Sequence, residues 1–156
     1  MKNKKKIGVG LVGSGTVAYW HIKAIKRHKD LELIAIFSSS ISHGKQLANK
    51  LVIKYYSIYL DMLKDENIGL IDIATISNKH ADFAIEAIKN GKNVLVEKPI
   101  DIDLKKAEKL VELANNKKRI LSCVSEFCFA PGIIQLKELI RTNSLGKVYM
   151  VNISVP

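Results

Sequence analysis

The chain has 156 residues, of which 47% are hydrophobic and 26% are charged. This is the length of one domain, and the composition excludes a disordered chain. No apolar run reaches the ~18 residues that a membrane-spanning helix needs, so we expect no membrane partner. The basic start at residues 1–6 is like the first part of a signal peptide, but the apolar run that follows is too short to complete one. We therefore expect a cytoplasmic protein.

The net charge is +10 and comes mostly from lysine, because only three arginines are present. Proteins that read nucleic acids usually rely on arginine and aromatic side chains along one face, and these lysines are scattered. We expect no nucleic-acid partner, although the positive charge favours an anionic cofactor or substrate. The two cysteines, Cys123 and Cys128, have neither metal-site spacing nor a disulfide framework, so no metal is predicted.

Strands and helices alternate along most of the chain. In chain order, the apolar patterns predict a strand at 7–12, a helix at 17–25, a strand at 31–37, two short helices at 43–51 and 58–63 around a weak strand at 53–56, a strand at 70–76, a helix at 80–90 ending at Gly91, a strand at 93–96, a helix at 104–114 capped by Asp103, and a strand at 120–124. The strands are continuously apolar, which indicates a parallel sheet covered on both faces. The predicted fold is α/β, a Rossmann-type doubly wound parallel sheet.

The last part of the chain departs from the alternation of strands and helices. A helix follows Pro131, and residues 147–155 then alternate like the first strand of a new sheet. We therefore expect a cofactor-binding domain over residues 1–125, followed at 126–156 by a connecting helix and the first strand of a second domain. An unpaired strand is an edge that invites association or disorder, which favours a fragment or a truncated chain.

A glycine-rich turn directly follows the first strand and opens the first helix. In this context Gly13 makes the tight turn, Gly15 lets the backbone approach a pyrophosphate, and Ala18 permits close packing of the helix. Thr16 and Val17 lie in the same turn, where free N–H groups and the helix dipole favour phosphate. These residues are predicted to bind a dinucleotide. The alternative is a tight turn that binds nothing.

The end of the second predicted strand bears on the choice between NAD and NADP. The acidic residue that usually holds the ribose 2′-hydroxyl is absent, and Ser38 stands in its place. Ser38 and Ser39 offer hydroxyl groups without negative charge, and His43 and Lys45 follow closely enough to meet a 2′-phosphate. We therefore predict NADP or NAD as the cofactor, with NADP favoured.

Glu97, Lys98 and Pro99 end the strand at 93–96, at the sheet edge where open α/β sheets bind ligands. A lysine at this edge can hydrogen-bond a substrate hydroxyl and move its proton while hydride leaves for the nicotinamide. Lys98 is therefore the candidate catalytic residue. The alternative is an ordinary surface lysine before a turn proline.

Together these motifs resemble those of the glucose-fructose oxidoreductase, inositol dehydrogenase and rhizopine catabolism protein (Gfo/Idh/MocA) family. The resemblance lies in residues 9–15 with His21, in 74–80, and above all in 91–99. It implies an NAD(P)-dependent oxidoreductase that transfers hydride to or from a hydroxyl or carbonyl carbon of a sugar, cyclitol or related small molecule. By the same resemblance, cofactor contacts are implied for Thr75, Asn78, His80, Glu97 and Lys98, with Lys98 also facing the reacting carbon. A cis Lys98–Pro99 bond is implied as well.

Several of these positions can also be explained by structural roles that need no cofactor. His21 and Trp20 are more typical of packing or surface residues on the first helix, Asn78 is a possible helix cap, and His80 a possible exposed first-turn residue. The loop at 125–131 departs from the family pattern, so substrate preference does not transfer.

The family's second domain, which shapes the substrate pocket and carries oligomer contacts, would begin near Gly146. It is missing or truncated here, so this chain alone is expected to lack a complete active site. A homo-oligomer is possible. The alternative functions are a non-catalytic NAD(P)-binding or redox-sensing module and a remnant that binds nothing.

Overall fold

The computed structural model describes residues 6–153, and the chain divides into two compact units, Met1–Val124 and Ser125–Pro156. The lysine-rich start, except for Lys6, lies outside the described residues. None of the described helices is long and apolar enough to cross a membrane.

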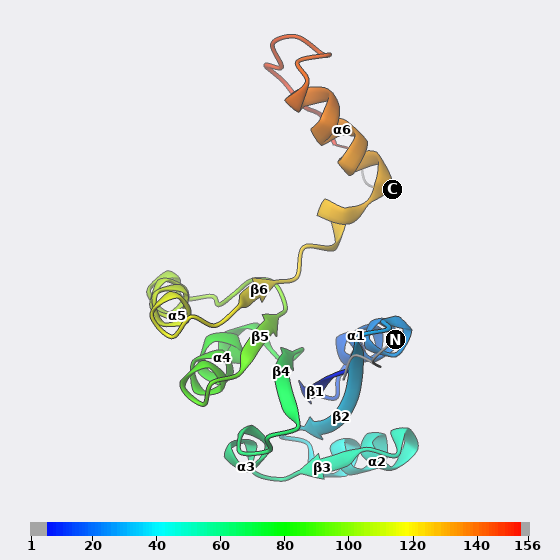
Figure 1. Cartoon of the computed structure of the whole chain (residues 1–156), viewed down its shortest axis with the longest axis vertical. Helices are drawn as coiled ribbons and strands as arrows, with labels where there is room; N and C mark the ends of the chain where they lie inside the picture. Colours follow the sequence, from blue (N-terminus) through cyan, green and yellow to red (C-terminus); the bar gives the residue numbers. More distant parts are fainter. Residues whose placement is uncertain (1–5, 154–156) are drawn as a thin grey trace, which may run out of the picture. The chain divides into compact units, whose positions relative to one another are not determined.

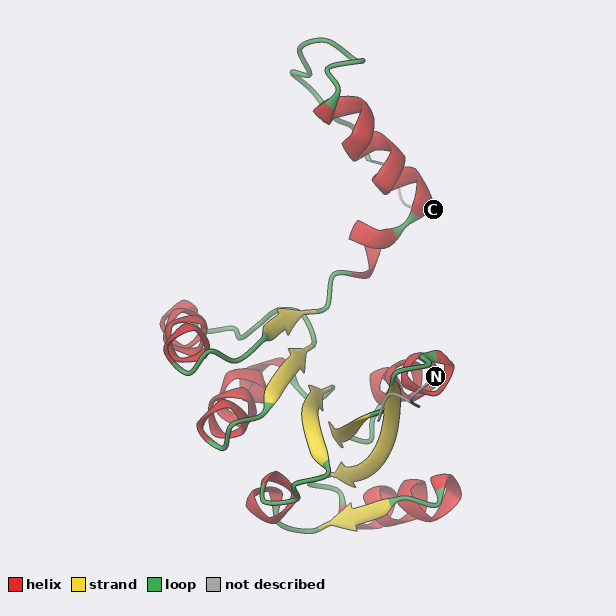
Figure 2. Cartoon of the chain, viewed as in Figure 1, coloured by secondary structure: helices red, strands yellow, loops and turns green. Residues whose placement is uncertain are grey.

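The first unit is built on one parallel sheet of six strands in the order β3-β2-β1-β4-β5-β6 (Figure 2). Its strands are β1 (Ile7–Val12), β2 (Leu31–Phe37), β3 (Lys54–Tyr56), β4 (Ile68–Ile73), β5 (Asn93–Val96) and β6 (Leu121–Cys123). All five pairings are parallel. Strand β1 lies between β2 and β4, so the strand order reverses at β1. Ligands of open α/β sheets bind outside the carboxyl ends of the strands at such a reversal.

Helices cover both faces of this sheet, as Figure 1 shows. The helices are α1 (Thr16–Arg27), α2 (Ile41–Leu51), α3 (Tyr59–Leu63), the 3₁₀ turn η1 (Ser77–Lys79), α4 (His80–Lys89) and α5 (Leu104–Asn116). One apolar core packs α3, α4 and α5 against the sheet, and a second packs α1 and α2 against the opposite face. Neighbouring residues of β1 enter different cores, Leu11 on the α1 side and Val12 on the α4 side. This explains why the strands are continuously apolar.

The second unit contains the 3₁₀ turn η2 (Glu126–Phe129) and α6 (Pro131–Arg141). The strand predicted at 147–155 is not formed over the described residues 147–153, and residues 154–155 lie outside the description. Alternation says which side chains share a face, but a strand also needs a neighbour to receive its main-chain hydrogen bonds, and no described strand pairs with it. That prediction was therefore wrong for residues 147–153.

Smaller differences concern where elements end. The strand predicted at 70–76 is observed as Ile68–Ile73. Ala74 still donates its N–H to the carbonyl oxygen of Val12 at 2.9 Å, and the chain then leaves the sheet through η1.

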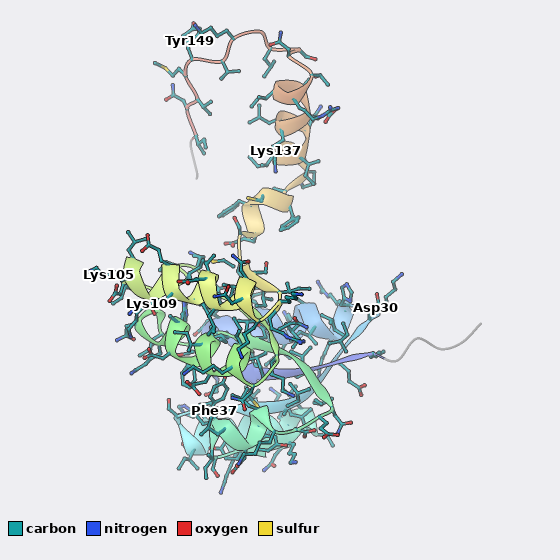
Figure 3. All side chains as sticks on the ribbon, turned by 60° about the vertical axis from the view of Figure 1, so that its left-hand side comes forward. Asp30, Phe37, Lys105, Lys109, Lys137 and Tyr149 are labelled. Carbon is teal, nitrogen blue, oxygen red and sulfur yellow. The ribbon has the colours of Figure 1, made fainter. Side chains whose placement is uncertain are left out.

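The helix cap predicted at Asp103 is confirmed, because its carboxylate accepts from the N–H groups of Lys105 and Lys106. On α5 the exposed side chains of Lys105 and Lys109 point outward (Figure 3).

Candidate functional site

The glycine-rich turn joins β1 to α1 and also contacts the ends of the two neighbouring strands. Gly13 has φ +119, and its N–H donates to the carbonyl oxygen of Phe37 at 2.9 Å. A Cβ atom at Gly13 would lie 2.2 Å from the carbonyl oxygen of Ala74, which belongs to the main chain after β4. Both the backbone angle and the available space therefore require glycine here.

Gly15 meets a different constraint, because it is the N-cap of α1 with ordinary backbone angles, φ −80 and ψ −174. A Cβ atom there would have no neighbour within 4 Å. No described side chain caps α1, its first turn holds no acidic residue, and Thr16 and Val17 are exposed. The positive end of the α1 dipole therefore faces open space above Gly15, as an anion site requires.

Ser38 connects the end of β2 to this turn. Its hydroxyl lies 2.7 Å from the hydroxyl of Ser14 and also accepts from the N–H of Ser40 at 3.2 Å. Ser38 is buried, whereas Ser39, His43 and Lys45 are exposed. Ser38 thus lies beside the glycine-rich turn and contacts it through Ser14, whereas Ser39, His43 and Lys45 lie on the surface. Their contact with a cofactor stays a prediction.

The loop after β4 carries three of the predicted cofactor residues in different settings. Thr75 is partly buried and Asn78 is exposed in η1. Asn78 does not cap α4, because Lys79 precedes that helix; the N–H of Ala81 instead donates to the carboxylate of Asp101 at 3.1 Å. Asn78 is therefore open to a ligand, as its predicted role requires.

His80 is only 1% exposed, so the interpretation as an exposed first-turn residue is wrong. Its Nδ1 lies 2.7 Å from the carbonyl oxygen of Pro99 and its Nε2 lies 3.1 Å from that of Thr75. The ring therefore ties the loop after β4 to the loop after β5. Its predicted contact with the cofactor stays a prediction.

Glu97 and Lys98 follow β5 at the same carboxyl edge. The N–H of Glu97 donates to the carbonyl oxygen of Ile73 at 3.0 Å, so the chain continues beside β4 before it turns. The bond Lys98–Pro99 is cis, as the resemblance implied. The Lys98 side chain is exposed, and its ammonium has no ion-pair partner among residues 6–153. Lys98 is thus exposed at this edge, and its contact with a ligand stays a prediction.

A buried ion cluster joins α1, β4 and the end of β5. Nδ1 of His21 lies 2.8 Å from Oδ1 and 2.9 Å from Oδ2 of Asp72, and its Nε2 lies 3.0 Å from Oε1 of Glu97. Burial by itself lowers the pKa of His21, but the hydrogen bonds and charges of Asp72 and Glu97 outweigh it and raise the pKa to about 9. His21 is therefore a cation at neutral pH.

The sequence interpretation of His21 as a packing or surface residue missed this cluster. Two signals were present. His21 lies three residues after Ala18 and four before Ile25, two buried residues of α1, so it belongs to the same side of the helix. Asp72 stands inside an otherwise apolar strand, where a charge needs a partner.

The ion cluster makes the stability of the domain depend on pH. Because the pKa of His21 is raised in the folded chain from 6.5 to about 9, its contribution is fully present below pH 6.5 and is lost as pH rises through about 9. We expect the free energy of unfolding in urea to fall over this range. The fall should be much smaller in His21→Gln and unchanged in the control His28→Gln, which alters an exposed histidine after the same helix. Equal slopes in all three proteins would show that His21 does not titrate in this way.

A parallel sheet that reverses at β1, a turn where only glycine fits and an open helix N-terminus define a dinucleotide-binding domain of the Rossmann class. The family model described as "Oxidoreductase family, NAD-binding Rossmann fold" (GFO_IDH_MocA) matches residues 7–125. The chain belongs to this Gfo/Idh/MocA family.

Relatives are similar over most of this chain. It is 30% identical over 144 residues to the rhizopine catabolism protein MocA of Rhizobium meliloti, which covers 92% of this chain and 45% of the relative. It is 29% identical over 153 residues to the D-xylose 1-dehydrogenase (NADP(+)) of Hypocrea jecorina, covering 90% and 39%. The crystal structure of the WlbA dehydrogenase of Bordetella pertussis, in complex with NADH and UDP-GlcNAcA, matches with a TM-score of 0.88 at 27% identity, covering 93% and 45%. The chain thus spans less than half the length of these relatives.

Proposed function

We propose that this chain is the cofactor-binding part of an NAD(P)-dependent oxidoreductase. The whole enzyme would transfer hydride between the nicotinamide and a hydroxyl or carbonyl carbon of a sugar, cyclitol or related small molecule. The observation that carries the proposal is the open space above Gly15, at the N-terminus of α1 and beside a turn that only Gly13 can make. In a dinucleotide site this space is where the pyrophosphate approaches the main chain.

The proposed roles follow the geometry of the carboxyl edge. The first-turn N–H groups of α1, near Thr16 and Val17, would hold the pyrophosphate. The exposed Asn78 and Lys98 would face the nicotinamide side of the site. Lys98 would hydrogen-bond the reacting hydroxyl, take up its proton when the cofactor accepts hydride, and return a proton to the carbonyl oxygen when the cofactor supplies hydride. These assignments rest on position and chemistry.

We further propose that residues 1–125 form the cofactor domain, and that 126–156 connect it to a substrate-binding part. A sugar or polyol substrate suits the relatives that contain "D-xylose" or "UDP-GlcNAcA" in their names. A cytoplasmic location and assembly into a homo-oligomer are part of the same proposal. The alternative is a non-catalytic NAD(P)-binding or redox-sensing module. It would bind cofactor but would not transfer hydride when the substrate-binding part is supplied.

Selectivity between the two cofactors provides a prediction at Ser38. We expect Ser38→Asp to weaken NADPH binding by about tenfold or more relative to NADH, because the new carboxylate would repel the 2′-phosphate and accept from the ribose 2′-hydroxyl of NADH. The site can accept a carboxylate, since the Ser14 hydroxyl and the Ser40 N–H already contact the Ser38 oxygen. Calorimetric titration with both cofactors measures the change.

Ser38→Asn is the matched control, because it has nearly the same size and no charge. Its ratio of NADPH to NADH affinity should stay close to that of the unchanged chain. The preference for NADP itself would be wrong if the unchanged chain bound NADH more tightly than NADPH.

A further inference from the structure

Three side chains from separate elements meet in the ion cluster of His21, Asp72 and Glu97. The side chains of these residues are 9%, 2% and 15% exposed, so water competes little with their contacts. Carboxylates only accept hydrogen bonds, so both ring nitrogens of His21 must carry protons to donate to Asp72 and Glu97 together. The cluster is therefore a cation between two anions.

Glu97 contacts both His21 and the main chain of Lys98. Oε1 of Glu97 is held by His21, and Oε2 accepts from the N–H of Lys98 at 3.0 Å. Both oxygens of one carboxylate are thus engaged, one inside the cluster and one at the start of the proposed catalytic loop. Fixing the first oxygen limits how the carboxylate can turn, which also fixes the second.

A further titratable group near Glu97 is the thiol of Cys123, at the end of β6. Burial and the charge of Glu97 raise the pKa of this thiol, so it is neutral at physiological pH. It adds no negative charge that would compete with Glu97 for His21. The electrostatic partners of His21 among the described residues are therefore Asp72 on β4 and Glu97 after β5.

We propose that His21 is a positioning residue for Lys98. By holding Glu97 against Asp72, it fixes the carboxylate that receives the Lys98 N–H, and so sets the direction from which the lysine side chain leaves the sheet edge. This inference rests on the proposed function, in which Lys98 meets the reacting hydroxyl. If the ion cluster had only a structural role, loss of His21 would destabilise the domain as a whole, because it leaves buried charges without a partner, and would not act on Lys98 in particular.

The test is the main-chain amide of Lys98, followed by NMR in the isotope-labelled 156-residue chain without any cofactor. In His21→Gln we expect the hydrogen-exchange protection of the Lys98 amide to fall by about tenfold or more, the loss expected when a hydrogen bond to a charged group breaks. The amides of Val94 and Val96 in β5 should keep their protection. The control His28→Gln should leave all three amides unchanged.

A titration of the unchanged chain keeps the test independent of folding in the variant. As pH rises through about 9, His21 loses its proton, and the carboxyl carbon of Glu97 and the main-chain nitrogen of Lys98 should change their chemical shifts together. Unchanged Lys98 protection in folded His21→Gln, or a loss of protection spread evenly over β5, would overturn the proposal. So would a titration of His21 that leaves the Lys98 signal unmoved. Because no cofactor is present, these outcomes are separate from a failure of NAD(P) binding, which would overturn only the proposed function.

Discussion

Lys98→Met should remove nearly all turnover while cofactor binding stays close to normal. General acid–base catalysis contributes about 10²- to 10⁴-fold to rates, and methionine retains the length of the lysine hydrocarbon stem without an ammonium that can donate. The Lys98 side chain is exposed and takes part in no described ion pair, so its removal should cost the fold little. A large loss of rate with intact binding would mark Lys98 as a group that acts on the reacting atoms.

The rate must be measured where a substrate-binding part is present. A suitable protein carries residues 7–125 of this chain in place of the matching segment of the D-xylose 1-dehydrogenase relative, with NADPH formation followed by absorbance. The matched control is Lys109→Met, which removes an exposed lysine from the outer side of α5 (Figure 3). Equal turnover with and without Lys98 would exclude this lysine from the mechanism.

Gly15→Ala should abolish tight cofactor binding in a chain that folds normally. The new methyl group would meet no atom within 4 Å beyond the adjoining residues, and the φ of −80 suits alanine, so the free energy of unfolding should fall by only about 1 kcal/mol, the cost of alanine at an N-cap. The methyl group would occupy the space where the pyrophosphate approaches the backbone. We expect NADH affinity to fall by about 100-fold, which corresponds to about 2.7 kcal/mol.

Two other glycines separate an effect on binding from an effect on folding. Gly132→Ala, at the start of α6, also has open space around its Cβ and should change neither stability nor affinity by much. Gly13→Ala should instead destabilise the domain strongly, because its Cβ would lie 2.2 Å from a carbonyl oxygen and its φ is +119. Thermal unfolding and fluorescence titration of the three variants make the comparison. Normal NADH binding by Gly15→Ala would place the cofactor elsewhere.

Local patterns were sufficient to predict most of the sheet. The strands at 31–37 and 93–96 were found at their observed limits, because they are short apolar runs between turn residues. The sequence at 147–155 has the same local character and forms no strand over its described residues, because pairing depends on neighbours that a local pattern does not reveal. Individual elements are therefore easier to predict than the contacts between them.

The candidate site shows the same limit. The turn at Gly13 and Gly15 could be recognised because its chemistry lies in consecutive residues. The ion cluster joins His21 to residues 51 and 76 positions further along the chain, and no spacing rule links them. The sequence contained only the separate signs of a buried charge. Likewise, His80 contacts the carbonyl oxygen of Pro99, a residue 19 positions further along the chain, and no local pattern links the two.

Binding of NADH to the unchanged 156-residue chain is the most direct test of the proposed function. Isothermal titration calorimetry at pH 7.5, with folding verified by circular dichroism, measures it. A single saturable site, reproduced with NADPH and competed by either cofactor, is the expected result. A folded chain that shows no saturable binding of NADH or NADPH would contradict a dinucleotide site at the glycine-rich turn.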